Sequence, residues 1–242
     1  MSGSAIVIGV GASAGLGGAL CRRFAAEGLQ VVAAGRTVAK LDALAGEIRR
    51  GGGAIVPLVA DATRAEDVAR VFDAAERAAG APRLVAFNAG NNRMRPLLEM
   101  DDAFFEDAWR VCCFGGFLVG REAARRMLPA GGGTLLFTGA TASVRARPPF
   151  TAFASAKAAL RALAHGMARE FGPQGLHVGH VIIDGGIDGD QLNSRFPQFK
   201  EARGADGMLA PDAIADAFWG LHVQQRSAWT LELDLRPYKE SF

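Results

Sequence analysis

Short apolar segments alternate with longer amphipathic segments along the chain, and this alternation constrains the fold more than any other feature. Expected strands, rich in β-branched and aliphatic residues, cover 4–10, 30–34, 54–59, 83–88, 134–138, 177–183 and 229–235. Helical periodicity covers 15–27, 38–50, 64–79, 102–128, 152–171 and 211–222. Strands that alternate with helices require right-handed crossovers and a parallel sheet covered on both faces. The sequence therefore predicts a doubly wound α/β fold with a single sheet of about seven strands.

Composition narrows the class of protein further. The chain has 242 residues, half of them hydrophobic, and we expect one domain spanning 1–242. The formal charge of +2 is too small to indicate nucleic acid or a membrane surface as a partner. Three cysteines without disulfide or metal spacing indicate a reducing compartment. With no signal-like start and no long apolar run, we expect a cytoplasmic protein without a metal.

A glycine-rich turn follows the first expected strand. The sequence GVGASAGLG occupies 9–17 and leads directly into the first expected helix. Glycines let a backbone approach a pyrophosphate, and a helix N-terminus offers free N–H groups and the positive end of its dipole. Ligands of doubly wound sheets bind outside the carboxyl ends of the strands, where this turn is expected. The turn therefore predicts a dinucleotide site.

Three segments together resemble the short-chain dehydrogenase/reductase family. The sequence VGASAGLG over 10–17 is similar to the family's TGxxxGxG turn, with Val10 in place of the threonine. The sequence FNAG over 87–90 is similar to the NNAG motif after the fourth strand. Asp61 matches an acidic residue that the family places near the adenine ring. The resemblance covers nearly the whole chain and implies an NAD(P)-dependent oxidoreductase with a small-molecule substrate, whose binding region lies around 184–210.

The resemblance also implies which residues contact the cofactor. They lie in the first turn, after the second, third, fourth and sixth strands, and on the helix after the fifth strand. The implied set is Gly11, Ser13, Ala14, Gly15, Leu16, Gly17, Arg36, Asp61, Ala62, Asn88, Ala89, Gly90, Lys157, Gly185 and Ile187.

The residue after the second strand indicates which cofactor is bound. Binding NAD through its ribose hydroxyls calls for an acidic residue there, and the sequence VVAAGRT over 31–37 has none. Arg36 instead offers a planar, permanent cation that suits a 2′-phosphate. We therefore expect NADP in preference to NAD.

The segment FASAK over 153–157 corresponds to the family's Tyr-x-x-x-Lys pair. In the family the lysine contacts the nicotinamide ribose and lowers the pKa of the tyrosine, which exchanges a proton with the substrate. Here Lys157 is retained, but Phe153 occupies the tyrosine position. Lys157 is therefore interpreted as a cofactor ligand without its usual catalytic partner.

Other positions that the family uses are altered as well. Ala140 occupies the usual serine position, and Cys112 aligns with an asparagine that kinks the preceding helix. Thr141 is the best-placed substitute for the serine, with Thr138 and Ser143 nearby. The turn after the sixth strand is DGGID over 184–188 instead of Pro-Gly.

Two functions follow from these changes. The first is an NADP-dependent oxidoreductase with a substitute proton donor, for which Thr141, Ser143, Cys112 and a water near Lys157 are candidates. Asp184 and Asp188 join them if burial raises their pKa. The second is a catalytically silent NADP-binding protein that acts as a sensor or a partner scaffold.

Two further expectations concern the ligand and the assembly. Loops after the fourth and fifth strands carry Arg93, Arg95, Arg145 and Arg147, which predicts an anionic substrate unless they pair with nearby carboxylates. The resemblance implies a homodimer or homotetramer built on the helices at 102–128 and 152–171. Their small residues allow close helix approach: Gly115, Gly116, Gly120, Ala156, Ala159 and Ala162.

Overall fold

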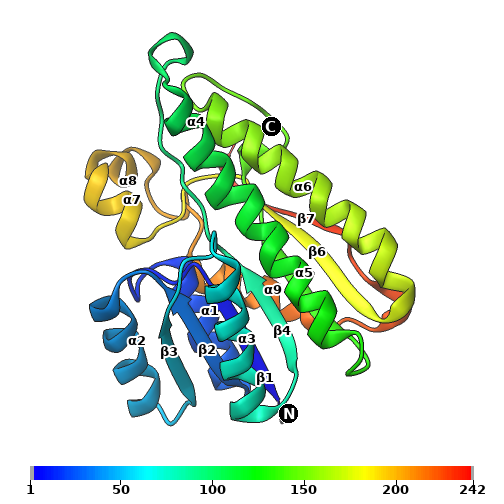
Figure 1. Cartoon of the computed structure of the whole chain (residues 1–242). Coiled ribbons are helices and arrows are strands. Elements are labelled where there is room, and N and C mark those ends of the chain that lie inside the picture. Colours follow the sequence, from blue (N-terminus) through cyan, green and yellow to red (C-terminus); the bar gives the residue numbers. More distant parts are fainter. Residues whose placement is uncertain (1–2, 241–242) are drawn as a thin grey trace.

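A computed structural model describes residues 3–240 and contains one parallel sheet of seven strands (Figure 1). The strands follow the spatial order β3-β2-β1-β4-β5-β6-β7, and every neighbouring pair is parallel. Their bounds are β1 Ser4–Ile8, β2 Gln30–Gly35, β3 Ile55–Val59, β4 Pro82–Phe87, β5 Gly133–Thr138, β6 Leu176–Ile183 and β7 Glu232–Leu235. The predicted doubly wound α/β fold is confirmed.

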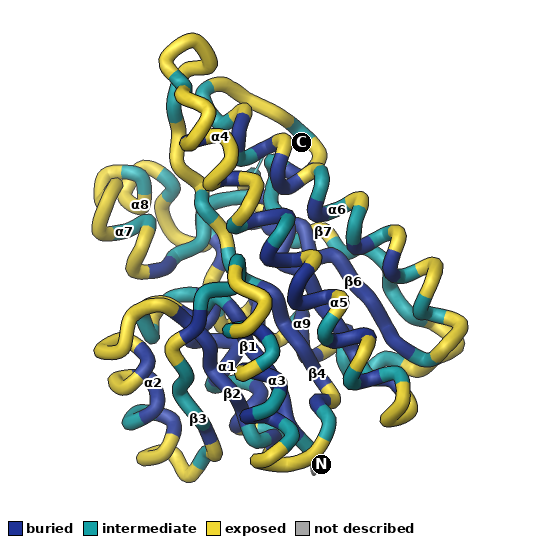
Figure 2. Tube along the Cα trace, in the orientation of Figure 1, coloured by how far each residue is buried: buried dark blue, intermediate teal, exposed yellow. Residues whose placement is uncertain are grey.

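Helices cover both faces of this sheet. One face packs against α1 (Leu16–Ala26), α2 (Val38–Arg50) and α9 (Pro211–His222). The opposite face packs against α3 (Ala65–Ala79), α5 (Gly115–Met127) and α6 (Thr151–Phe171). The inner strands and the inner helix faces are buried, whereas the edge strands β3 and β7 are only partly buried and the outer helix faces are exposed (Figure 2). Because β6 is covered on both faces, all eight of its residues are buried, including His177 and His180 among its aliphatic residues.

The structure differs from the expected elements in three places. The helix expected over 102–128 is divided into α4 (Asp102–Trp109), a π-helical turn η2 (Arg110–Phe114) and α5. Two short helices, α7 (Asp190–Arg195) and α8 (Pro197–Arg203), lie in the region around 184–210, where no helix was predicted. Strand β7 is also shorter than the expected 229–235.

None of the helices within residues 3–240 has the length and apolar character needed to cross a membrane.

The sheet order changes direction at β1, which lies between β2 and β4. Connections from β1 run one way to β2 and β3, and the later strands β4 to β7 are added on the other side. In such sheets the loops separate at this point and leave a crevice at the carboxyl ends of the strands. The glycine-rich turn after β1 therefore lies where a ligand is expected.

Candidate functional site

The glycine-rich turn and the FNAG segment contact each other directly. Gly9 has φ of +95°, and a Cβ at this position would lie 2.4 Å from the backbone nitrogen of Ala89. Asn88 donates its side-chain amide to the Gly9 carbonyl (3.1 Å) and its backbone N–H to the Ile8 carbonyl (2.7 Å). Only glycine tolerates both this conformation and this contact. The carboxyl ends of β1 and β4 are thereby fixed together.

The N-terminus of α1 is open to an anion. The helix begins at Leu16 after Gly15, without a side-chain cap and without an acidic residue in its first turn. Its first N–H groups and the positive end of its dipole therefore have no competing carboxylate on the helix. A Cβ on Gly11 would meet no atom within 4 Å, so space remains beside the turn. This donor set fits a pyrophosphate.

The side chain of Ser13 is directed toward the helices α1 and α2 instead of toward the expected anion. Its hydroxyl donates to Glu47 on α2, and Arg22 on α1 donates to the Ser13 carbonyl (2.8 Å) and Oγ (2.9 Å). Arg22 also forms an ion pair with Asp212 at the start of α9 (3.1 Å). Three helices thus brace the turn from outside. Arg22 and Glu47 were not identified from the sequence, because a charged residue on a helix has no local signature of a distant partner.

Arg36 and Asp61 lie at the ends of β2 and β3. Arg36 is exposed, and its side chain forms no ion pair or hydrogen bond within residues 3–240. The Asp61 carboxylate accepts hydrogen bonds from the backbone N–H (2.9 Å) and the hydroxyl (2.8 Å) of Thr63, so it organises its own turn. Ala62 follows it and lies close to Gly115 of α5. Arg36 therefore remains free to meet a ligand, whereas one Asp61 oxygen is already engaged.

Lys157 is buried between the carboxyl ends of β4 and β5, with 3% of its surface exposed. Its Nζ donates to the Thr138 carbonyl (2.7 Å) and would lie 3.7 Å from a Cβ on Gly90. The ring of Phe153, one turn earlier on α6, has its centroid 5.8 Å from Nζ. Burial lowers the pKa of Lys157, because removing the ammonium from water disfavours its charged form. Within the described chain no carboxylate forms an ion pair with it.

Thr141 donates its hydroxyl to a buried carboxylate. Its Oγ1 lies 2.6 Å from Oδ1 of Asp184, which is 2% exposed at the end of β6. Arg145 contacts both Asp184 oxygens at 3.0 and 3.1 Å, and Arg236 contacts Oδ2 at 3.0 Å. Thr141 and Asp184 thus belong to one ionic cluster that joins the ends of β5, β6 and β7.

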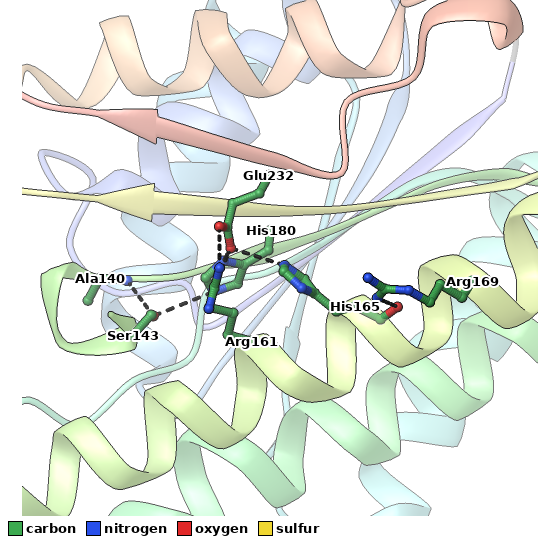
Figure 3. A network of polar contacts seen from close by, with 7 residues as sticks. All are labelled: Ala140, Ser143, Arg161, His165, Arg169, His180 and Glu232. Carbon is green, nitrogen blue, oxygen red and sulfur yellow. Dashed lines mark hydrogen bonds and ion pairs between the residues drawn. The ribbon is translucent and has the colours of Figure 1, made fainter. Parts of the chain in front are cut away.

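Ser143 belongs to a second polar network, on the α6 side of the sheet (Figure 3). Its Oγ accepts the Ala140 N–H (3.1 Å) and lies 3.5 Å from Nε2 of His180, which is fully buried. His180 Nδ1 lies 3.0 Å from Oε2 of Glu232, which Arg161 contacts through two N–H groups.

The protonation states in this network follow from its partners. Hydrogen bonds from Arg161 lower the pKa of Glu232 to about 2, so it is ionised at neutral pH. Burial lowers the pKa of His180 to about 4, so its ring is neutral. The ring then donates from Nδ1 to Glu232 and can accept the Ser143 proton at Nε2. Ser143 therefore holds the loop that follows β5 in place.

Asp188 is a candidate proton donor on the condition that its pKa is raised, and the structure does not meet that condition. The pKa of Asp188 lies below its usual range, because Lys200 (2.8 Å) and Asn193 (2.7 Å) donate to it. Asp188 is therefore not the proton donor that a raised pKa would have made it. Asp188 is only partly buried, so the adjacent Lys200 ammonium lowers its pKa by more than burial raises it.

The segment after β6 passes over the glycine-rich turn. Gly185 follows Asp184, and Ile187 pairs with Leu209 in an isolated parallel bridge. A Cβ on Gly189 would lie 3.2 Å from the Ala14 carbonyl. The helices α7 and α8 that follow project to one side of the sheet (Figure 1), beside a hollow of about 590 Å³.

The loops after β4 and β5 lie together, as expected, but most of their arginines are paired. The Arg95 N–H donates to the Pro149 carbonyl (3.0 Å) and joins the two loops. Arg93 pairs with Asp107 (3.6 Å), Arg95 with Asp101 (2.7 Å), and Arg145 with Asp184. Arg147 is exposed and has no such side-chain partner within residues 3–240.

Three comparisons place this chain among known proteins. Residues 5–198 match the family model described as short chain dehydrogenase. The crystal structure of a short-chain dehydrogenase from Rhodopseudomonas palustris superposes with a TM-score of 0.82 and 40% identity, over 98% of this chain and 99% of that one. Galactitol 2-dehydrogenase (L-tagatose-forming) of Cereibacter sphaeroides is 34% identical over 69% of this chain and 66% of that protein. The uncharacterized oxidoreductase YuxG of Bacillus subtilis is 33% identical over 90% of this chain, which spans 31% of the length of that longer protein.

Proposed function

This chain belongs to the short-chain dehydrogenase family, and on that premise we propose that it is an NADP-dependent oxidoreductase. Its reaction would interconvert a small carbonyl compound and the corresponding alcohol. The relative named galactitol 2-dehydrogenase (L-tagatose-forming) carries a name for a reaction of this class. The proposal includes a single domain over 1–242 that acts in the cytoplasm, where its three free, buried cysteines would stay reduced.

The observation that carries this proposal is the order of the candidate residues along one edge of the sheet. Arg36 follows β2, the glycine-rich turn follows β1, Asn88 to Gly90 follow β4, and Lys157 lies beside the end of β5. These four strands are adjacent in the order β2-β1-β4-β5. A cation at one end, an open helix N-terminus in the middle and a buried lysine at the other end suit a 2′-phosphate, a pyrophosphate and a nicotinamide ribose in turn.

The protein's own contribution to the reaction is orientation and proton transfer. The nicotinamide, when bound, supplies or accepts the hydride. Lys157 would hold the ribose, and Asn88 keeps the glycine-rich turn aligned with β4. Phe153, which we place at the family's tyrosine position, has its ring centroid 5.8 Å from the Lys157 Nζ but cannot give a proton. The hydroxyl of Thr141 is a weak substitute in this role, because it already donates to Asp184.

The substrate would bind beside the segment 184–210, between α7, α8 and the joined loops after β4 and β5. Gly185 and Ile187 lie where this segment crosses the sheet edge, next to the glycine-rich turn. Binding of an anionic substrate would depend on Arg147, because the other three loop arginines are paired with carboxylates. Arg147→Ala should then weaken binding of anionic carbonyl compounds relative to neutral ones.

A second function is a silent NADP-binding protein, which the missing hydroxyl groups at Phe153 and Ala140 favour. Both functions require cofactor binding, and only the first requires turnover. The test is to titrate NADPH and NADH by fluorescence and then to follow NADPH oxidation with carbonyl, enone and imine compounds. Binding without oxidation of NADPH by any of these compounds would favour the silent function.

A further inference from the structure

The hydroxyl groups around the expected donor positions are committed to other partners. Thr141 donates to Asp184, and Ser143 accepts from the Ala140 N–H while facing His180. Phe153 and Ala140 have no hydroxyl. A proton given by Thr141 or Ser143 would therefore break one of these contacts and leave a polar group unpaired, which is unfavourable away from water.

Thr138 is the remaining hydroxyl in this region. Its Oγ1 is buried without a hydrogen-bond partner within residues 3–240, and its carbonyl accepts the Lys157 Nζ. A neutral hydroxyl must itself receive a proton when it gives one, so it can only relay a proton from an ionisable neighbour. The ionisable group bonded to this residue is Lys157.

The Lys157 head group has protons to give. An ammonium carries three donor hydrogens, and one of them goes to the Thr138 carbonyl. The titratable groups that act on it are Cys112 from η2 and His180 from β6, and no carboxylate pairs with it in the described chain.

Two opposing effects set how easily this ammonium gives up a proton. The Phe153 ring, whose centroid lies 5.8 Å from Nζ, favours the cation through its negative face. Burial disfavours the cation, because it removes the ammonium from water, and the pKa of Lys157 lies below its ordinary value as a result. Burial is the larger effect. The ammonium is therefore a readier proton donor than a solvated lysine.

We propose, building on the function proposed above, that Lys157 is itself the general acid and base of this site. During reduction the carbonyl carbon gains a hydride from the reduced nicotinamide, and the carbonyl oxygen gains a proton from Nζ. The C=O π bond becomes the new O–H bond, and the N–H pair stays on nitrogen. The neutral amine then regains a proton from water. In alcohol oxidation the same amine accepts the hydroxyl proton.

The first test measures the protonation of Lys157 without any substrate. The chain has only four lysines, at Lys40, Lys157, Lys200 and Lys239, so protein labelled with ¹⁵N-lysine gives four Nζ signals. The Lys157→Arg variant identifies the signal of Lys157. We expect it to lose its proton at lower pH than the other three, with and without NADPH. Titration together with the other lysines, or above them, would overturn the proposal.

The second test separates cofactor binding from proton transfer. Arginine keeps the positive charge but holds its proton throughout this pH range, whereas methionine keeps only the length of the side chain. Lys157→Arg should bind NADPH about as well as wild type and reduce carbonyls about 10²–10⁴-fold more slowly. Lys157→Met should lose both NADPH binding and carbonyl reduction. The matched control is Lys40→Arg, on the exposed surface of α2. Circular dichroism would show whether each variant is folded.

The pH dependence gives a third reading. Wild-type carbonyl reduction should decline as pH rises through the pKa of Lys157, and alcohol oxidation should increase over the same range. A Lys157→Arg protein that reduces carbonyls at the wild-type rate contradicts this inference alone. Wild-type protein that binds NADPH but reduces no carbonyl contradicts the proposed function, and the lysine titration then still decides whether Lys157 can act as an acid.

Discussion

At the scale of single residues, the proposed cofactor preference and the proposed proton donor depend on two cationic side chains. Arg36 is the one side chain of the expected cofactor set that is both exposed and cationic at the end of β2. At the other end of the set, Lys157 is buried and held by the Thr138 carbonyl. Between them the glycine-rich turn offers backbone groups. Changes at the two ends should therefore affect binding preference and chemistry separately.

Arg36→Asp should reverse the cofactor preference. Wild-type protein is expected to bind NADPH more tightly than NADH, because a guanidinium can pair with the 2′-phosphate through two hydrogen bonds. An aspartate would repel that phosphate and accept hydrogen bonds from the ribose hydroxyls. The ratio of the NADPH and NADH dissociation constants should change about tenfold for each 1.4 kcal/mol by which a close charge contact alters the binding free energy. Fluorescence titration of both cofactors measures it, and equal wild-type affinities would contradict the role of Arg36.

Phe153→Tyr should add a conventional proton donor beside Lys157. The ring position is already one turn from the lysine, so the new phenol needs little rearrangement. We expect carbonyl reduction to rise, and Ala140→Ser in the same protein to raise it further, each through a hydrogen bond to the substrate oxygen. NADPH oxidation by a carbonyl panel is the measurement. A double variant that binds NADPH without any gain in rate would show that the pocket differs by more than two lost hydroxyls.

At the scale of elements, β6, β7 and α6 are joined by the network of Ser143, His180, Glu232 and Arg161 (Figure 3). A second cluster, of Asp184, Arg145 and Arg236, joins the ends of β5, β6 and β7. Loops after β5, β6 and β7 are thus fixed by buried polar groups as well as by the apolar core. Buried networks of this kind rigidify a structure when every group is paired.

This network predicts a loss of stability in acid. The folded pKa of His180, about 4, lies below its ordinary value of 6.5, so the unfolded chain binds more protons between these values. Stability is therefore fully present above pH 6.5 and is lost as pH falls toward 4, by about 3 kcal/mol for this residue. Urea unfolding at several pH values across this range measures the free energy of unfolding. This free energy should change less steeply with pH for His180→Gln than for wild type.

His222 provides the comparison for that experiment. Burial also lowers its pKa to about 4, and its Nδ1 contacts the Thr134 hydroxyl (2.9 Å), away from the network. His222→Gln should reduce the pH slope without affecting the loop after β5. If neither variant changes the slope between pH 6.5 and 4, buried neutral histidines do not control acid stability.

At the scale of the whole molecule, the glycines of α5 bear on the expected assembly into a homodimer or homotetramer. Three of the glycines expected at a helix contact between subunits pack inside their own subunit instead. A Cβ on Gly116 would lie 2.4 Å from Leu160, one on Gly120 would lie 2.8 Å from Met167, and one on Gly115 would lie 3.3 Å from the Ala62 carbonyl. Gly116 and Gly120 bring α5 close to α6, which lies beside it (Figure 1), whereas Gly115 faces the segment before α3.

The surface of α4, η2 and α5 offers a different contact. Phe105, Trp109 and Phe117 are about 40% exposed, and Phe114 packs between the rings of Trp109 and Phe117. Exposed aromatic groups of this kind are typical of interfaces. We expect a homodimer or homotetramer that buries this surface. Trp109→Glu should shift light-scattering mass toward the monomer, with Val223→Glu on another exposed surface as the control. A monomeric wild-type protein would contradict the assembly.

The sequence by itself determined the sheet class and the position of the glycine-rich turn. Hydrophobic periodicity reports which face of each segment is buried, and glycine spacing reports where the backbone must turn or approach another chain segment. Those properties are local, so they could be predicted without knowing the strand order. The position of Lys157 could also be predicted from the sequence, because it lies four residues after Phe153 in the segment that resembles the family's Tyr-x-x-x-Lys pair.

Only the tertiary structure decided which groups meet. Asp184 is held by arginines 39 residues before it and 52 residues after it, and His180 lies between Ser143 and a glutamate on β7. These partners come from different loops and are brought together by the order and register of β5, β6 and β7. A charged residue carries the same local pattern whether its partner is water or a distant carboxylate. The committed hydroxyls of Thr141 and Ser143, and hence the role left to Lys157, could therefore not be predicted from sequence.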